Sequence, residues 1–347
     1  MSTLAIELTG TGAHPQAWRR KDSRAEELFG GRYWVDVAQA AERAGAHLLF
    51  VPDAFDGRSL DAVAIAARVA TSTSTLGLVP TVTVTHTEPF HVSKAIATVD
   101  IASLGRAGWQ VEVSEGAEPA ALVGRKDAQN PASLWQEAGE AAEVVTRLWD
   151  SWEDNAEIRD ESTNRFVDRD KLHYIDFEGE FFSVKGPSIT PRSPQGQPPI
   201  AVRVTGPESA AFAAAHADIV RIRAASLEEA AVVTARVRRA VVAQGRDPQN
   251  VRILLDIDIL VGDDAAADVA QLEEWAGQVF EADTVTFVGN GEALSDLVAS
   301  VDISVADGVT LRPLTLSTLL ALPSGTTTAG TLRDHLGLDR PANQYAI

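Results

Sequence analysis

The sequence predicts an α/β protein, a (β/α)8 TIM barrel that forms one domain. Short apolar runs typical of buried parallel strands alternate with segments whose apolar residues recur at helical spacing, and this alternation yields eight strand candidates. The strand candidates are residues 3–8, 47–51, 76–84, 107–113, 199–204, 219–222, 251–261 and 309–311. Eight strand–helix units are the number that closes such a barrel.

The helices between these strands follow from their apolar stripes and their ends. Residues 33–44 carry Trp34 and Val37 on one face, and residues 89–103 begin with a proline, which is favoured at the first helical position. Residues 133–152 form the longest candidate. The other helix candidates are residues 60–70, 208–216, 227–244, 265–280 and 292–300, and residues 283–288 add a further strand-like run.

The alternation breaks over residues 153–197. This segment is polar and rich in Pro and Gly, and it contains two strand-like runs, 174–177 and 181–184, that are typical of a hairpin. We therefore expect a single barrel domain over residues 1–347. Within it, residues 153–197 form an excursion that is inserted after the fourth strand–helix unit and packs beside the C-terminal face of the barrel.

An open, doubly wound sheet is the structural alternative. Such a sheet usually carries a G-x-G-x-x-G turn after its first strand, whereas Gly10-Thr11-Gly12 lacks the third glycine and is not followed by a helix pattern. The sequence also lacks the G-x-x-x-x-G-K-[ST] phosphate loop and the G-x-S-x-G serine elbow. These differences argue against a dinucleotide-binding protein and against a serine hydrolase.

Composition and charge exclude further classes. Of 347 residues, 45% are hydrophobic and 23% charged, so a large core is available and general disorder is excluded. The net charge of −19 repels nucleic-acid phosphates and anionic membranes, so we expect neither as a partner. The absence of cysteine excludes disulfides, zinc–thiolate sites and iron–sulfur clusters. Without a signal-peptide pattern or an 18-residue apolar run, the protein is expected to be cytoplasmic.

His86, Glu88 and His91 have a spacing that superficially suggests a metal site. The run His86-Thr87-Glu88 is also similar to the H-x-E of zinc deaminases, but that motif requires two cysteines further along the chain. These side chains lie partly in a loop and partly at the start of a helix, so they need not converge on one point. The negative charge of Glu88 is favourable near a helix N-terminus because of the helix dipole. We therefore expect no bound metal.

Polar residues mark the positions where a barrel places its active site, the C-terminal ends of the strands. Asp53 ends the second strand, where its carboxylate either binds a ligand or caps the next helix. Thr81, Thr83 and Thr85 alternate along the third strand, so they either present hydroxyls to the barrel mouth or are simply β-favouring residues.

Seven segments taken in order resemble the bacterial-luciferase-like flavin-dependent monooxygenases. The similarity is to the branch of nitrilotriacetate, dibenzothiophene-sulfone and pristinamycin-type monooxygenases, and it is strongest over residues 10–197. The segments are GAHPQAWR (12–19), LFVPD (49–53), THTEPFHVSK (85–94), GRAGW (105–109), LWDSWE (148–153), HYIDFEG (173–179) and FSVKGP (182–187).

This resemblance implies an enzyme that takes reduced FMN from a separate flavin reductase and uses dioxygen to oxygenate a small organic substrate. The cofactor supplies the chemistry, while the protein orients it and excludes water. Related barrels use a deazaflavin, which is the alternative cofactor. The family pairs through early barrel helices, which implies a homodimer with Tyr33, Trp34 and residues 60–70 at its interface.

The resemblance also implies the cofactor-binding residues. Asp53 matches the acidic residue near the flavin ring, and Thr81 matches the hydroxyl residue that contacts the flavin. Gln110 stands where the branch usually has Asn, and Trp135 stands where it has Tyr.

Two histidines are the candidate catalytic residues. His14 follows the first strand and His86 the third, so we expect both to face the barrel mouth beside Asp53, Thr81 and Gln110. There they would polarise a substrate or stabilise a peroxide.

The phosphate end of the implied flavin site departs from the family pattern. The Gly-Ser-Ser turn that holds the phosphate falls on Thr205-Gly206-Pro207, and Pro207 has no backbone N–H to donate. FMN is therefore expected to bind weakly, unless Arg203, Arg221 or Arg223 supplies the missing charge from the strand ends.

Two functional hypotheses follow from this departure. The first is a flavin monooxygenase with a rearranged phosphate site. The second is a flavin-poor or flavin-free barrel that acts as a ligand-binding protein or as a non-catalytic partner subunit. The absorbance spectrum of the protein after incubation with oxidised and reduced FMN distinguishes them.

Overall fold

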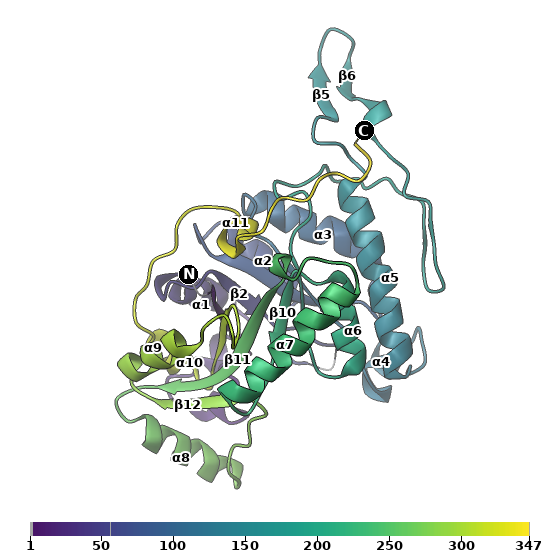
Figure 1. Ribbon diagram of the computed structural model, residues 1–347. Helices are drawn as coiled ribbons and strands as arrows, with labels where there is room; N and C mark the ends of the chain where they lie inside the picture. The colour runs from purple at the N-terminus through teal and green to yellow at the C-terminus, as the bar shows by residue number, and fades with distance from the viewer. Residues whose placement is uncertain (1–2, 56, 347) are drawn as a thin grey trace.

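Eight parallel strands close into a barrel in the computed structural model, which describes residues 3–55 and 57–346 (Figure 1). The strands, in order around the barrel, are β1 (Thr3–Glu7), β2 (Leu48–Val51), β3 (Gly77–Thr83), β4 (Trp109–Glu112), β9 (Ile200–Arg203), β10 (Ile219–Ile222), β11 (Arg252–Val261) and β13 (Gly308–Pro313). Pairing of β1 with β13 and of β10 with β11 completes the ring. The predicted barrel is confirmed, with strand ends within a few residues of those expected.

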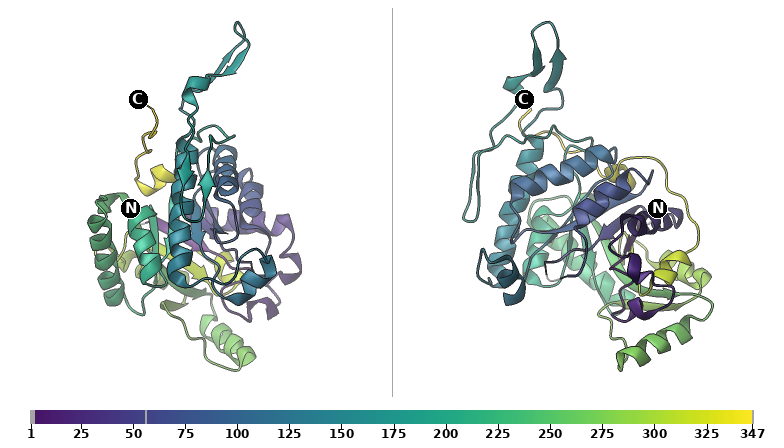
Figure 2. Two further views of the ribbon diagram at one scale, coloured as in Figure 1. Left: turned by 90° about the vertical axis from the view of Figure 1, so that its right-hand side faces the viewer. Right: turned by 180° about the vertical axis from the view of Figure 1, so that it is seen from behind.

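Helices surround this barrel, as the three views show (Figures 1 and 2). Several begin with a side-chain cap: Asp61 accepts a hydrogen bond at the start of α2, Asn130 at α5 and Ser226 at α7. The helices are α1 (Gly31–Arg43), α2 (Ala62–Ala70), α3 (Pro89–Ala102), α4 (Ala117–Val123), α5 (Pro131–Asp150), α6 (Pro207–His216), α7 (Leu227–Ala243), α8 (Ala265–Ala276), α9 (Gly291–Ser300), α10 (Leu316–Leu320) and α11 (Leu332–Leu336). Within the described residues, none combines the length and apolar character needed to cross a membrane.

Several short elements lie outside the predicted strands and helices, among them α4, α10 and α11. The strand-like run at 283–288 becomes β12 (Val285–Gly289), which pairs with the part of β11 that continues beyond the barrel and so forms an additional edge strand. Helix α4 was not predicted, because its Ala- and Glu-rich sequence has no apolar stripe of helical spacing.

The glycine turn after β1 brings its backbone into close contact with another segment of the chain. Gly12 has a φ of +143°, and a Cβ on it would lie 2.3 Å from the carbonyl oxygen of Leu314. Only glycine allows this approach. The turn therefore packs against the chain just after β13, in a closed barrel, instead of opening a nucleotide-binding helix.

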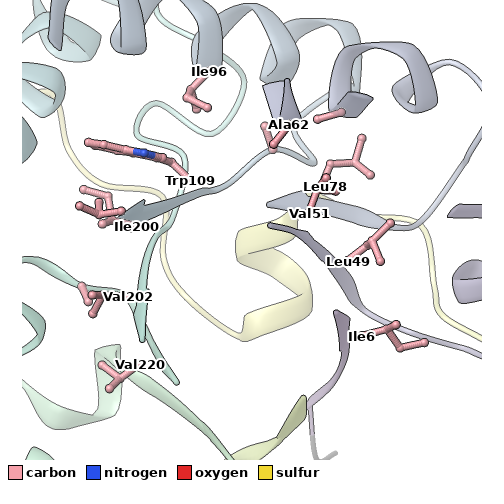
Figure 3. Packing of buried hydrophobic residues seen from close by; sticks show 14 of the residues in the cluster. Ile6, Leu49, Val51, Ala62, Leu78, Ile96, Trp109, Ile200, Val202 and Val220 are labelled. Carbon is pink, nitrogen blue, oxygen red and sulfur yellow. The ribbon is translucent and has the colours of Figure 1, made fainter. Parts of the chain in front are cut away.

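Helix α11 closes the N-terminal end of the barrel. Leu332 and Leu336 are buried in one cluster with interior residues of six strands, including Leu48 and Phe50. The N–H of Leu332 donates to the carbonyl of Gly105, just before β4 (2.8 Å). Figure 3 shows this helix, in pale yellow, inside the ring of strands, while the labelled side chains of the larger cluster lie between the strands and the surrounding helices.

The excursion lies mainly at this N-terminal end, so the expected position beside the C-terminal face is wrong. Helix α5 runs antiparallel to the strands, so the chain leaves it at the N-terminal end of the barrel. There Arg192 pairs with Asp150 at the end of α5 (2.9 Å), and Gln195 donates to the carbonyl of Ala107 (2.7 Å).

The excursion contains two hairpins. The hairpin of β5 (Glu157–Asp160) and β6 (Arg165–Val167) projects away from the barrel (Figures 1 and 2). The pair of β7 (Phe177–Glu178) and β8 (Ser183–Val184) forms the predicted second hairpin. Its turn lies along α5, where Glu140 accepts from the N–H of Glu180 (2.8 Å).

Replacing Leu332 by alanine is expected to lower the free energy of unfolding by about 2–5 kcal/mol, because it opens a cavity under fully buried strand residues. Leu320→Ala is the matched control: Leu320 is 54% exposed in α10, so the change should cost no more than about 0.5 kcal/mol. Denaturant unfolding measures both. Equal losses in the two variants would contradict the closing role of α11.

Candidate functional site

A cavity of about 390 Å³ opens at the C-terminal ends of the strands, where the sequence predicts the active site. We call it the mouth cavity. It is lined by Glu7, Thr9, Gly10, Leu28, Trp34, Pro52, Asp53, Ala54, Gly57, Arg58, Ser59, Thr81, Gln110, Glu112, Arg203 and Arg312. Its volume lies within the range of small-molecule and cofactor sites, and three of the predicted cofactor-binding residues, Asp53, Thr81 and Gln110, line it together.

Thr81 and Gln110 are neighbours on β3 and β4. Their registered positions let the Gln110 amide Nε2 donate to Thr81 Oγ1 (3.1 Å), and both side chains are buried. Gln110 Oε1 accepts from Arg221 (2.9 Å), which fixes the orientation of the amide. Because Thr81 Oγ1 already accepts, its O–H remains able to donate to a molecule in the cavity.

Asp53 holds the loop that covers one side of the mouth cavity. Its Oδ1 accepts from the N–H of Ala54 (2.8 Å) and the hydroxyl of Ser59 (3.0 Å), and its Oδ2 accepts from the N–H of Ala62 at the start of α2 (2.9 Å). The two roles considered for this carboxylate are binding a ligand and capping the next helix, and these contacts show the capping role. Asp53 therefore shapes the cavity through the loop that it fixes.

A buried ionic network forms the floor beneath the cavity. Arg221, on β10, has no exposed surface and makes a bidentate pair with Asp256 on β11 (2.9 and 2.8 Å), while its Nη1 also donates to Glu7 on β1. Burial alone would raise the pKa of Glu7, but the guanidiniums of Arg221 and Arg312 hold it well below its usual range. The ring of Phe50 lies 4.4 Å from the Arg221 guanidinium carbon.

The network continues toward the rim. Arg312 lies 3.1 Å from Glu7 and 2.7 Å from Asp258, and burial raises the pKa of Asp258 to about 6. Burial also raises the pKa of Glu112 and outweighs the attraction of Arg203, which lies 3.4 Å away. The rim therefore carries charged groups of both signs.

Sequence reasoning missed this network. It treated Arg221 as a free charge at a strand end and gave Glu7, Asp256 and Arg312 no role. The available signal was charge inside apolar strands: residues 252–261 read RILLDIDILV, in which Asp256 and Asp258 interrupt a buried run. Buried acids need partners, so that pattern indicates buried cations on neighbouring strands.

The turn expected at the flavin phosphate lies outside the mouth cavity as the described residues define it. Thr205 and Gly206 precede α6, and their N–H groups both donate to Ser209 Oγ (2.9 and 3.0 Å). Trp135 is buried, with its ring 5.4 Å from that of Phe212 on α6. These three predicted residues are not among the described residues that line the mouth cavity with Asp53, Thr81 and Gln110.

The expected placement of the two histidines at the cavity is wrong, because neither is among the described residues that line it. His14 is buried with its ring 5.0 Å from Phe280, its Nδ1 accepts from the N–H of Gln16 (3.1 Å), and burial lowers its pKa. His86 packs edge-on against Phe55 (5.5 Å), and burial and the charge of Lys126 lower its pKa. A catalytic role for either stays a prediction.

The residues considered as a metal site do not act together. Glu88 pairs with Arg125 (3.2 Å), His86 faces Phe55, and His91 lines a second cavity. Within residues 3–55 and 57–346, no three His, Asp or Glu side chains converge as metal ligands would.

This second cavity, of about 500 Å³, lies between α2 and α3 and shares Asp53, Ala54 and Thr81 with the mouth cavity. Its helical lining is largely apolar and includes Val63, Ala67 and Ala95. Tyr33 and Trp34, by contrast, are buried within the chain: Tyr33 donates to the carbonyl of Gly10 and Trp34 to that of Leu28. They cannot supply the interface that the resemblance implied for them.

The fold and the site define an α/β barrel with a cavity of small-molecule size at the C-terminal strand ends, and comparison with known proteins gives its family. Residues 10–299 match the model of the luciferase-like monooxygenases. The chain is 34% identical over 282 residues to N-acetyl-S-(2-succino)cysteine monooxygenase of Bacillus subtilis, covering 78% of this chain and 64% of that protein. The chain belongs to the luciferase-like monooxygenase family.

Other relatives agree with this assignment. Dibenzothiophene-sulfone monooxygenase of Rhodococcus erythropolis is 33% identical over 282 residues, which cover 76% of this chain and 62% of that one. The chain thus spans slightly less than two thirds of the length of these relatives. The crystal structure of a long-chain alkane monooxygenase has the same fold, with a TM-score of 0.88 at 21% identity over 97% of this chain and 95% of that chain.

The two ends of the site differ in how well they fit a flavin. At the ring end, the mouth cavity offers the Thr81 hydroxyl, the ordered Gln110 amide and the apolar wall of Trp34 and Leu28. At the phosphate end, the turn is already hydrogen-bonded to Ser209. The residues present therefore fit the flavin ring but not the phosphate.

Asp256→Asn is expected to lower the free energy of unfolding by about 3–5 kcal/mol, because it leaves the buried Arg221 charge without its bidentate partner. The control is Asp36→Asn, which breaks the partly exposed pairs with Arg24 and Arg32 and should cost at most about 1 kcal/mol. Denaturant titration compares them. A loss at Asp256 as small as at Asp36 would contradict the central role of the network.

Proposed function

We propose that this chain is the oxygenase of a two-component monooxygenase that receives reduced flavin from a separate reductase and oxygenates a small organic substrate. The observation that carries the proposal is the mouth cavity of a luciferase-like barrel, in which Asp53, Thr81 and Gln110 come together. Relatives that are named monooxygenases support it, including component A of nitrilotriacetate monooxygenase of Aminobacter aminovorans at 29% identity. A flavin, when bound, supplies the activation of dioxygen.

In this proposal the protein binds the flavin and orients it. The Thr81 hydroxyl donates to a flavin ring, and Gln110 holds that hydroxyl in place. The loop fixed by Asp53 covers one side of the cavity and restricts water. We propose further that His86 and His14 act through the loops that they support, because neither reaches the cavity.

One observation favours the second functional hypothesis. The N–H groups of Thr205 and Gly206 are already hydrogen-bonded to Ser209, which leaves these two donors unavailable to a cofactor phosphate. A barrel that holds no flavin would serve as a ligand-binding protein or as a non-catalytic partner subunit. Distantly similar folds include F420-dependent enzymes, so a deazaflavin belongs in the same test.

Anaerobic titration with reduced FMN is expected to quench tryptophan fluorescence to saturation, because Trp34 lines the mouth cavity. Thr81→Val should weaken binding about threefold to tenfold by removing one hydrogen-bond donor. Thr83→Val is the matched control, since Thr83 is on the same strand but is not among the residues that line this cavity. If neither reduced FMN nor a reduced deazaflavin saturates the protein, the flavin-free hypothesis replaces the first.

We also propose a homodimer that pairs through the apolar groove between α2 and α3. Light scattering should give twice the mass of one chain. Ala67→Glu, in the groove, should shift the protein to monomer, because it places a charge in the interface. Ala235→Glu changes an exposed alanine of α7 and should leave the dimer intact. A monomer mass for the unaltered protein at micromolar concentration would refute the pairing.

A further inference from the structure

The turn before α6 already uses two backbone donors that an anion could otherwise take. Ser209 Oγ accepts from the N–H groups of Thr205 (2.9 Å) and Gly206 (3.0 Å) and lies 3.0 Å from the Gly206 carbonyl, to which it donates. Pro207, the first residue of α6, contributes no N–H. A phosphate that takes these two N–H groups must first displace the Ser209 hydroxyl, which also lies 3.4 Å from Thr205 Oγ1.

Charge at the turn also opposes an anion. Glu208 follows Pro207, and a Cβ on Gly206 would lie 3.6 Å from its Oε2, so the carboxylate stands beside the turn. The three strand-end arginines that might compensate all have carboxylate partners: Arg203 has Glu112 (3.4 Å), Arg221 has Asp256 (2.8 Å), and Arg223 has Asp283 (2.7 Å). An added phosphate would compete with these carboxylates for the paired nitrogens, while Nε of Arg203 and of Arg223 makes no hydrogen bond within the described residues.

The opposite end of the site carries none of these obstacles. The mouth cavity presents the Thr81 hydroxyl, which is free to donate, and an apolar wall that includes Trp34. These features suit a flat ring system and do not depend on what the ribityl chain ends in.

We infer that this site selects its flavin by the ring and not by the phosphate, so that riboflavin binds as tightly as FMN. The inference rests on the proposed function, because it requires that a flavin binds in the mouth cavity. Ser209 and Glu208 are then the residues that cancel the contribution of the phosphate. The site would accept the dephosphorylated cofactor as readily as the phosphorylated one.

Parallel anaerobic titrations with reduced riboflavin and reduced FMN test the inference. Their dissociation constants are expected to agree within about fivefold, whereas two charge-assisted hydrogen bonds to a phosphate would favour FMN by about 100-fold or more. A preference for FMN greater than fivefold overturns the inference and leaves the proposed function standing. Failure of both flavins to saturate the protein overturns the proposed function, and the inference with it.

Variants of the turn test the assigned cause. Ser209→Ala frees the two N–H groups and should raise the preference for FMN above fivefold while the affinity for riboflavin stays unchanged. The control is Ser226→Ala, which removes a comparable cap from α7, where Ser226 Oγ accepts from Glu229 N–H (3.2 Å), and should change neither affinity. An unchanged ratio in Ser209→Ala would overturn the role of Ser209.

Glu208→Gln provides a second variant in case Ser209→Ala fails to fold. It keeps the Ser209 hydrogen bonds and removes one negative charge, so the affinity for FMN should rise relative to riboflavin. The gain should shrink as salt is added, because the repulsion that it removes is screened. No gain at low salt would overturn the electrostatic part of the inference.

Discussion

Arg221 places a positive charge inside the barrel, and none of the arginine's surface is exposed. The C-terminal half of the barrel is arranged around this charge. Its partners come from three other strands: Glu7 on β1, Gln110 on β4 and Asp256 on β11. A buried charge is tolerated only when it is paired and hydrogen-bonded, so these strands cannot move apart without exposing it. The interaction therefore ties opposite walls of the barrel together directly below the mouth cavity.

The same arginine orders the site above it. Because Arg221 donates to Gln110 Oε1, the amide of Gln110 must point its nitrogen at Thr81. The Thr81 hydroxyl is then an acceptor toward the protein and a donor toward the cavity. One buried guanidinium thus sets the hydrogen-bonding character of a side chain that it does not touch, and the ring end of the site is organised before any ligand binds.

The two ends of the barrel differ in their packing and in the polarity of their side chains. The N-terminal end is sealed by apolar packing of α11, with the C-terminal tail and the base of the excursion beside it: Arg340 near the C-terminus bonds to Asp154. The C-terminal end keeps a cavity lined by charged and polar groups. The excursion lies mainly at the N-terminal end, so its projecting hairpin does not cover the mouth cavity.

The sequence by itself determined the fold, because strand and helix candidates depend on local periodicity that every barrel unit repeats. It also determined the family and the positions of Asp53, Thr81 and Gln110, since strand ends converge in any closed parallel barrel. Spacing placed the Thr205–Gly206 turn correctly before α6 and identified the missing donor at Pro207.

Only the tertiary structure decided which side chains meet. His14 and His86 follow strands whose ends face the mouth, yet the loops turn their rings toward Phe280 and Phe55. Arg221 looked like an available charge, but its partners lie more than 30 residues away in sequence. Backbone periodicity is a local property, whereas the direction of a loop side chain and the pairing of a buried charge depend on contacts between distant segments, which exist only once the barrel has closed.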